Sequence, residues 1–427
     1  MSQTIAVEDI DLTSVEFWTR PMTWRDAAFR LLRQQRPFAF FAEPEIPEMP
    51  RGPGYYAVTR YHDIEHISRN PLDFCSGRGS TTVLDMPPEF AELFGSMIVM
   101  DDPRHARIRG IVARRFTPRA LERLLDSVEE VTDEILDAAA PQGEVDFVDA
   151  IAAPLPLLII CDMMGIPRSH YREVLGHTNR ILSAGDPELI GDDTQRRDNL
   201  INSGLALVGL MNELAEERRK HPEDDLTSAL IHAGDEGEDD RLTAQEISSF
   251  FILLVVAGNE TTRTALTHGM YQLTINPDQR EILTRDLEGV VPTAVEEIVR
   301  YASPVTYMRR TVTRDGIEVG GHRFSEGDKL VLFYNSGNRD ETVFDDPDRF
   351  DVRRDPNPHI GFGAPGPHYC LGAHLARREM SVMLRRLFQR LPDIEVTGEP
   401  ERLEGALPLV NGIKRMPVRF TPAAPGA

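Results

Sequence analysis

The chain has 427 residues, of which 41% are hydrophobic and 27% are charged, as in an ordinary globular protein. Its net charge of −22 makes nucleic acid and anionic membranes poor partners. Three cysteines are too few for a disulfide framework, and the longest apolar run, Phe250–Ala257, is far too short to span a bilayer. The acidic segment Met1–Asp11 lacks the apolar stretch of a secretory signal, so we expect a cytoplasmic protein with no membrane span.

The pattern of the first half is mainly helical. Tyr55–Thr59 favours a short strand, and a mostly helical region follows from about Pro103 to Pro292, with loops near residues 140–144, 185–193 and 234–241. One short segment is crowded with arginines, which suit either a solvated helix face or a patch for an acidic protein partner. These are Arg104, Arg107, Arg109, Arg114, Arg115 and Arg119.

The clearest helix is predicted from about Thr243 to Ile275. Thr243 and Glu246 have the spacing of a capping box, and Asn276-Pro277 ends the helix. Its apolar middle predicts a central, buried position. There the sequence is Ala257-Gly-Asn-Glu-Thr-Thr262, in which an interior glycine costs about 0.5–1 kcal/mol and can let a flat ligand approach the backbone. Glu260 and Thr261, an acid beside an alcohol, can relay protons, although both also occur in ordinary buried helices.

A small β-region is expected after this helical body. A helix over Pro292–Tyr301 comes first, and irregular chain from Gly337 to Pro367 is long enough to suggest a functional role. Strands are predicted at Val305–Val312, Ile317–Phe324 with a Gly320-Gly321 turn, Lys329–Phe333 and within Ile394–Phe420.

The stretch from Gly361 to Gly372 is Gly-Phe-Gly-Ala-Pro-Gly-Pro-His-Tyr-Cys-Leu-Gly, followed by a helix predicted over Leu371–Leu391. Its first half has the spacing of a dinucleotide fingerprint, but no strand precedes it and two prolines remove backbone donors. A zinc site from Cys370, His368 and His374 matches no usual ligand spacing. A cysteine at a loop-to-helix junction lies near partial positive charge, which favours the thiolate that an axial iron ligand must be.

Two further pairs of residues can be interpreted together with this cysteine. Glu297 and Arg300 share a helical face, and Arg354 in the irregular stretch can complete a buried network, although a surface ion pair is the ordinary alternative. His105 and Arg109 also share a face. Together with Arg310 and His368 they can bind two carboxylates, although a solvated basic face is equally ordinary.

In this order the four motifs resemble the cytochrome P450 family over essentially the whole chain. The resemblance implies a mainly α fold with a small β-region, a triangular helical prism enclosing haem b, as one domain over residues 1–427. It makes Cys370 the metal ligand, Thr261 and Glu260 the oxygen-activating pair, and Glu297, Arg300 and Arg354 a structural triad. The remaining haem-binding residues would be His105, Arg109, Arg310, His368, Ala257, Gly258, Phe362 and Gly372.

One departure from the family pattern concerns the cysteine loop. The usual phenylalanine seven residues before the cysteine is Gly363 here, and Phe362 comes one residue earlier. A longer loop, and the segments around residues 94–99, 161–166 and 250–262, are similar to actinobacterial methyl-branched lipid ω-hydroxylases and cholesterol side-chain monooxygenases. The substrate pocket is predicted to be apolar and lined by Phe94, Ile98, Leu253, Ala257, Val305 and Leu409.

The resemblance implies a haem-thiolate monooxygenase that hydroxylates an apolar lipid, at the terminal methyl of a methyl-branched fatty lipid or of a sterol or isoprenoid side chain. No second cofactor domain is evident, so O2 reduction would draw electrons from a ferredoxin and its reductase, which the arginines near Cys370, including Arg377 and Arg378, suit. We expect a monomer. Two alternatives are a P450 that tailors a polyketide or terpenoid, and a haem-thiolate sensor without turnover.

Overall fold

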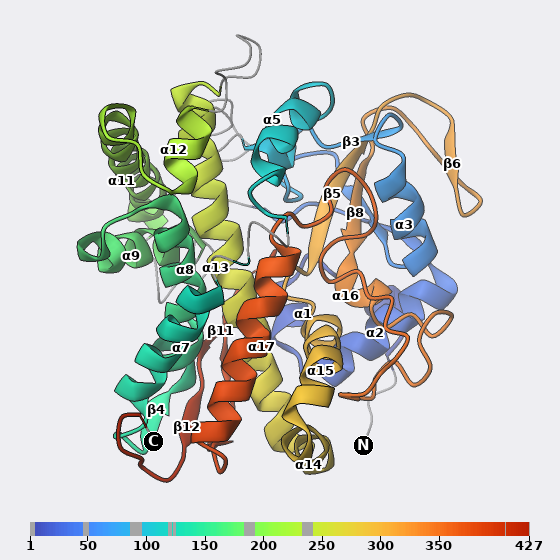
Figure 1. The fold of residues 1–427 in the computed structure, drawn as a ribbon. Coiled ribbons are helices and arrows are strands. Elements are labelled where there is room, and N and C mark those ends of the chain that lie inside the picture. Colours follow the sequence, from blue (N-terminus) through green and yellow to red (C-terminus); the bar gives the residue numbers. More distant parts are fainter. Residues whose placement is uncertain are drawn as a thin grey trace.

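The computed structural model describes residues 5–45, 51–85, 96–117, 122, 125–182, 193–232, 242–405 and 407–426. A large helical body and a smaller β-region make up this part of the chain (Figure 1). The longer helices of the body are α5 (Arg104–Ala113), α7 (Leu125–Ala139), α8 (Pro154–Met164), α9 (Tyr171–Leu182), α11 (Asp193–Lys220), α13 (Ala244–Ile275), α14 (Pro277–Arg285), α15 (Leu287–Ala302) and α17 (Ala373–Arg390).

Shorter elements connect the body to the β-region. They are η1 (Val7–Asp9), α1 (Val15–Thr19), α2 (Met22–Gln35), α3 (Tyr61–Arg69), η2 (Met97–Val99), η4 (Val148–Ala152), η5 (Arg168–His170), α12 (Leu226–Ile231) and α16 (Tyr334–Gly337). The helices between Met22 and Arg69 carry no prediction from the sequence, because neither a cap nor a long apolar stripe marks them.

The main sheet has the order β1-β2-β8-β5-β3, in which only the β2–β8 pair is parallel. Its strands are β1 (Phe38–Phe41), β2 (Tyr55–Val58), β3 (Phe74–Cys75), β5 (Tyr307–Val312) and β8 (Lys329–Phe333). Tyr307 faces Phe333 and Thr311 faces Lys329 across β5 and β8. This register places β8 at the centre of the sheet, and all five of its residues are buried.

Smaller sheets complete the β-region. They are the β6–β7 hairpin (Ile317–Val319 and His322–Phe324), the sheet β4-β12-β9 (Glu144–Asp146, Pro417–Arg419 and Glu395–Val396) and the pair β10–β11 (Glu401–Arg402 and Ile413–Arg415). Gly320 and Gly321 form the hairpin turn with φ of +57° and +82°, a conformation that L side chains rarely adopt. The predicted hairpin is therefore confirmed.

Helix α13 runs through the middle of the molecule beside α17 (Figure 1). The predicted capping box is present, since the Thr243 side chain accepts from the Glu246 N–H and the Glu246 carboxylate accepts from the Thr243 N–H. The C-terminal half of α13 packs with α7, α15 and α17 in one apolar core, and its N-terminal half packs with α8 and α11 in another. The prediction of a central helix is correct.

The prediction of a helix beginning at Pro292 is wrong by one and a half turns. Helix α15 begins at Leu287, and Pro292 lies inside it. The Asp286 carboxylate accepts a hydrogen bond from the Gly289 N–H and so caps the first turn. This cap supports the turn that precedes the proline, which removes only one intrahelical bond.

Candidate active site

The Cys370 loop is held by its own backbone ahead of α17. The Cys370 N–H donates to the Phe362 carbonyl over 2.9 Å, and the Gly363 N–H donates to the Ile360 carbonyl over 2.9 Å. Gly363 has φ of +86°, a conformation that would strain a phenylalanine. Phe362 instead supplies the aromatic ring, on which the Arg377 guanidinium lies 4.3 Å from the ring centroid. The displaced phenylalanine thus follows from the backbone conformation of the next residue.

The Cys370 thiol is in an environment that opposes ionisation. Burial raises its pKa above the usual value, while the Gly372 N–H and the Arg109 and Arg377 guanidinium groups act in the opposite direction. The backbone at the helix junction thus favours the thiolate, as the sequence predicts, but desolvation in the polypeptide alone opposes it more strongly. A bound metal cation deprotonates a coordinating thiol, so this site needs its metal to form the thiolate.

The middle of α13 presents a stripe of side chains that protein atoms do not fully cover. Leu253, Ala257 and Thr261 are four residues apart, and they are half-buried, exposed and half-buried, although buried residues flank them along the helix. The Thr261 hydroxyl donates to the Ala257 carbonyl over 2.7 Å. This stripe is the surface that the sequence predicts for the haem and the bound oxygen.

Gly258 and Glu260 face other parts of the protein than this stripe does. A Cβ on Gly258 would lie 2.6 Å from Cδ1 of Ile160, so the glycine permits the close packing of α8 against α13. The sequence suggests that this glycine makes room for a flat ligand, and helix packing is therefore a second explanation for it. The Glu260 carboxylate is buried, forms an ion pair with Arg263 and accepts from the Thr264 hydroxyl over 3.4 Å.

Burial raises the pKa of Glu260, and Arg263 and Thr264 act in the opposite direction. Thr261 and Glu260 are adjacent in sequence, yet the structure engages their side chains with different groups. A relay between them requires the Glu260 carboxylate to leave Arg263, which in turn donates to the Asn179 amide oxygen on α9 over 3.3 Å.

Four basic side chains that the sequence predicts to act together do converge. The rings of His105 and His368 are 4.3 Å apart, and the Arg109 guanidinium donates to the Tyr369 carbonyl over 2.6 Å. Burial, Arg310, His105 and Arg109 lower the pKa of His368 to about 2. These groups therefore lie close enough to repel one another.

This cluster fits the carboxylates of a haem. The carboxylates that act on it within the described chain are Asp102 and Asp101, both beside His105, and the buried Nε2 of His105 has no hydrogen-bond partner there. The basic cluster has too few protein carboxylates to balance its charge, and it lies next to an apolar stripe and a cysteine sulfur. Haem is a flat apolar group with two carboxylates, so it matches this set of residues. No group of three or more metal-binding side chains exists among the described residues, so the zinc alternative gains no support.

The predicted triad forms as a buried network. Arg300 donates twice to the Glu297 carboxylate, over 2.7 and 2.8 Å, and Arg354 donates to it over 3.2 Å. The same carboxylate accepts from the Asp351 N–H over 2.9 Å and from the Asn357 amide over 3.2 Å. Glu297 thereby ties α15 to the irregular segment that precedes the cysteine loop.

A neighbouring carboxylate was not predicted. Glu296 accepts from Arg377 on α17 over 2.6 Å and lies 2.9 Å from His359 Nε2. These partners lower its pKa to about 2 against the opposing effect of burial. Because Arg377 also covers Phe362, this network joins α15 to the cysteine loop and α17. The only signal in the sequence is that two glutamates are adjacent at the end of a helix.

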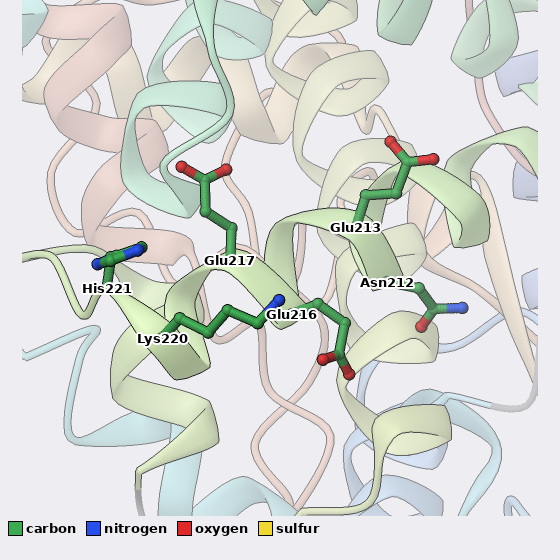
Figure 2. Close-up of a pocket in the computed structure, with 6 residues that line it drawn as sticks. All are labelled: Asn212, Glu213, Glu216, Glu217, Lys220 and His221. Atoms are coloured by element: carbon green, nitrogen blue, oxygen red, sulfur yellow. The ribbon is translucent and has the colours of Figure 1, made fainter.

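The predicted pocket residues are partly brought together. Val305 forms a bridge with Val410, and the neighbouring Thr306 N–H donates to the Leu409 carbonyl over 2.8 Å, so Val305 and Leu409 lie on adjoining segments. Ile98 lies in η2 and is half-buried, while Phe94 is outside the described residues. A separate hollow of about 460 Å³ lies over the exposed side chains at the end of α11 (Figure 2) and shares no residue with this set.

Comparisons with known proteins agree with this site. The sequence model "Cytochrome P450" matches residues 189–406. A methyl-branched lipid omega-hydroxylase of Mycobacterium tuberculosis is 47% identical over 420 residues, which are 98% of this chain and 96% of that protein. A steroid C26-monooxygenase of Mycolicibacterium smegmatis is 37% identical over 374 residues, 87% of this chain and 84% of that protein.

A solved structure gives the same result. The Mycobacterium marinum cytochrome P450 CYP268A2, in complex with pseudoionone, is 39% identical with a TM-score of 0.91, and the match covers 98% of this chain and 100% of that one. The fold and the site define a haem-thiolate oxidoreductase. The chain belongs to the cytochrome P450 family. It is accordingly a monooxygenase that uses haem b, receives electrons from a redox partner and acts on a lipophilic substrate. No helix in the described ranges is long and apolar enough to cross a membrane.

Proposed function

We propose that this P450 hydroxylates the terminal methyl of a methyl-branched fatty lipid or of a sterol or isoprenoid side chain. The observation that carries the proposal is 47% identity over 98% of the chain to a methyl-branched lipid omega-hydroxylase. The steroid C26-monooxygenase relatives support the same chemistry, since both printed activities involve an apolar lipid. Residues 1–427 would act as one domain and as a monomer in the cytoplasm.

The haem b of the family supplies O2 activation when it is bound, and the chain's own residues position it. Cys370 would be the ligand of its iron, and Phe362, Gly372, Ala257 and Gly258 would help to hold it. Its two carboxylates would accept from His105, Arg109, Arg310 and His368. Glu297, Arg300 and Arg354 would hold the loop in register, as the buried network already does.

Thr261 is the residue closest to the chemistry in this proposal. Its hydroxyl donates to the Ala257 carbonyl in this structure and would be the proton donor for the O2 chemistry that the haem supplies. Glu260 would restore that proton after its carboxylate leaves Arg263 and takes up a proton, which its raised pKa favours. The apolar wall of Leu253, Ala257, Ile98, Val305 and Leu409, with Phe94, would exclude water and present a carbon of the lipid.

Electrons would come from an acidic ferredoxin and its reductase. Arg114 and Arg115 are exposed at the end of α5, which lies near the beginning of α17 (Figure 1). In contrast, Arg104 and Arg107 are engaged by Glu246, and Arg377 by Glu296. The basic patch proposed for docking is therefore reduced to the end of α5 and its surroundings.

Binding spectra and product analysis test this function. Phytanic acid and cholest-4-en-3-one should shift the Soret band of the ferric holoenzyme toward the high-spin form, whereas a panel of macrolides should not. Turnover with a ferredoxin and its reductase should place the new hydroxyl on the terminal methyl. No shift with either lipid, or a shift with macrolides alone, would favour a role in polyketide tailoring.

A matched variant tests the iron ligand. Cys370→Ser should remove the red-shifted Soret band of the ferrous carbon monoxide complex, because a serine oxygen is not a thiolate. Cys75→Ser, at a buried cysteine in the main sheet, should retain that band. Survival of the band in Cys370→Ser would refute the ligand assignment, and the absence of both oxygen consumption and product in the wild type would favour a sensor.

A further inference from the structure

A small cavity lies behind the segments that carry Val305 and Leu409. Its volume is about 20 Å³. The residues that line it are Trp18, Met22, Arg25, Asp26, Tyr301, Ala302, Ser303, Thr306, Asn335, Arg339 and Asn411. Because about 10–15 Å³ are enough for one water molecule, the cavity has room for one water or one monatomic ion. It shares no residue with the haem cluster around His105 and His368.

Several buried polar atoms around this cavity have no hydrogen-bond partner among the described residues. They are Nε of Arg25, Nε of Arg339, the hydroxyl of Thr306 and Oδ1 of Asn335. Arg25, Arg339 and Thr306 are 7%, 2% and 2% exposed, so bulk water does not satisfy them. An unsatisfied buried group costs about 1–3 kcal/mol, and four around one cavity indicate an occupant.

The charge around the cavity is positive. Arg25 and Arg339 line it, and Arg402 is close enough that it contributes, after burial, to lowering the pKa of Arg25 to about 10. Asp26 is the carboxylate in the lining, and its Oδ2 lies 3.6 Å from Arg339 Nε, beyond hydrogen-bond distance. Glu399 and Asp26 both act on Arg402.

Aromatic rings balance this charge only in part. The Arg339 guanidinium lies 3.9 Å from the centroid of Tyr301, and the Arg25 guanidinium lies 5.7 Å from that of Trp18. Such contacts offset only part of the cost of burying two guanidinium groups, although Arg339 also donates to the Tyr301 carbonyl and forms an ion pair with Asp26. A water molecule would accept hydrogen bonds but leave the excess positive charge unbalanced. An anion would both accept the hydrogen bonds and balance the charge.

We propose that this cavity binds one monatomic anion of the size of chloride, held by Arg25, Arg339 and the hydroxyl of Thr306. The Asn335 side chain can turn its amide to present N–H groups, since the two ends of an amide are assigned from their partners. The site does not depend on the substrate or on the redox partner.

The anion would stabilise the wall behind which it sits. Thr306 donates through its backbone to Leu409, and the Asn411 N–H donates to the Pro304 carbonyl over 3.0 Å. Fixing Thr306 and Arg339 therefore fixes the two segments that bear Val305 and Leu409. A ligand that binds the folded state alone stabilises it by RT ln(1 + L/Kd), where L is the free ligand concentration.

Thermal unfolding of the holoenzyme tests this site. At constant ionic strength, replacing sodium gluconate by sodium chloride should raise the melting temperature in proportion to ln(1 + c/Kd), where c is the chloride concentration, with a Kd below about 50 mM. Arg25→Met should lose this dependence, and Thr306→Val should raise the fitted Kd at least threefold. Arg36→Met, at an exposed arginine at the end of the same helix, should behave as the wild type. Equal curves in chloride and gluconate for the wild type would overturn the proposal.

Crystals of the wild-type holoenzyme soaked in sodium bromide provide a test that needs no variant. Anomalous scattering should show bromide in the cavity within hydrogen-bond reach of Arg25 Nε and Arg339 Nε. Electron density without an anomalous peak would identify a water and refute the anion. If Arg25→Met does not fold, this experiment still decides the question.

Discussion

At the scale of single residues, Cys370 and its neighbours show how burial and polar contacts compete. Burial raises the pKa of the thiol, while the Gly372 N–H and two guanidinium groups lower it without prevailing. Polar contacts likewise hold the Glu260 carboxylate on Arg263 and the Thr261 hydroxyl on the Ala257 carbonyl of the same helix. For turnover, the Glu260 and Thr261 side chains must therefore leave these contacts, and the Cys370 thiol must ionise.

Thr261→Ala should uncouple oxygen consumption from hydroxylation, because the proposed proton donor is lost. We expect the fraction of electrons recovered in product to fall about a hundredfold, the low end of what a positioned proton donor contributes. The measurement compares NADPH consumption, hydrogen peroxide and product. Thr267→Ala is the control, since Thr267 makes the same bond to the carbonyl four residues earlier, at 2.8 Å, within the buried part of α13. Coupled hydroxylation at the wild-type rate in Thr261→Ala would reject the relay.

Glu379 on α17 has a folded-state pKa raised by burial from 4.5 to about 8, with the Thr262 hydroxyl as its partner. Because the unfolded chain loses this proton at lower pH, the stability of the folded protein should fall as pH rises from about 4.5 to about 8. Glu379→Gln should remove that decline. At about 1.4 kcal/mol per pKa unit, the gain at pH 8 is at most a few kcal/mol.

Melting temperatures of the holoenzyme between pH 5 and pH 8 measure this effect. Glu379→Gln and the wild type should melt together at pH 5, and the variant should melt higher at pH 8. Glu213→Gln, at an exposed position on α11, should follow the wild type throughout. Parallel profiles for Glu379→Gln and the wild type would show that the carboxyl does not titrate in this range.

At the scale of elements, α15 and the irregular segment after α16 depend on one carboxylate. Glu297 accepts from Arg300, Arg354, the Asp351 N–H and Asn357, and Arg300 in turn donates to the carbonyls of Asn338 and Pro347 over 2.8 Å each. This network replaces regular secondary structure in fixing a long stretch of chain ahead of the cysteine loop.

Glu297→Gln should destabilise the protein by about 3–5 kcal/mol, the cost of breaking a buried pair while its cations remain. Haem content after purification and the melting temperature of the holoenzyme are the measurements, and both should fall. Arg353→Met, at an exposed arginine next to Arg354, should leave both unchanged. Full haem content and an unchanged melting temperature in Glu297→Gln would contradict a structural role for the triad.

At the scale of the whole molecule, charge is distributed unevenly. The net charge is −22, yet basic side chains gather where α5 approaches α17, and several of them are neutralised by Glu246 and Glu296. The exposed remainder, Arg114 and Arg115, lies at the end of α5, the helix whose Arg109 donates to the Tyr369 carbonyl beside Cys370.

The double variant Arg114→Gln/Arg115→Gln should raise the KM for an acidic ferredoxin about tenfold and flatten its dependence on ionic strength, because charged contacts at an interface act mainly through association. Steady-state reduction at several salt concentrations measures both. Arg172→Gln, exposed on α9, should change neither value. An unchanged KM in the double variant would place the docking surface elsewhere.

The sequence by itself determined the helical body, the long central helix with its capping box, the Gly320-Gly321 hairpin and the order of the four family motifs. These depend on local patterns: the 3.6-residue period, turn-forming glycines and caps act over a few residues. Only the tertiary structure decided which way each functional side chain points. In it, Glu260 forms an ion pair with Arg263, Gly258 packs against Ile160, and Glu296 forms an ion pair with Arg377. The sequence does not predict these contacts, because they depend on how the elements pack. Burial, likewise a property of the folded chain, raises the pKa of the Cys370 thiol.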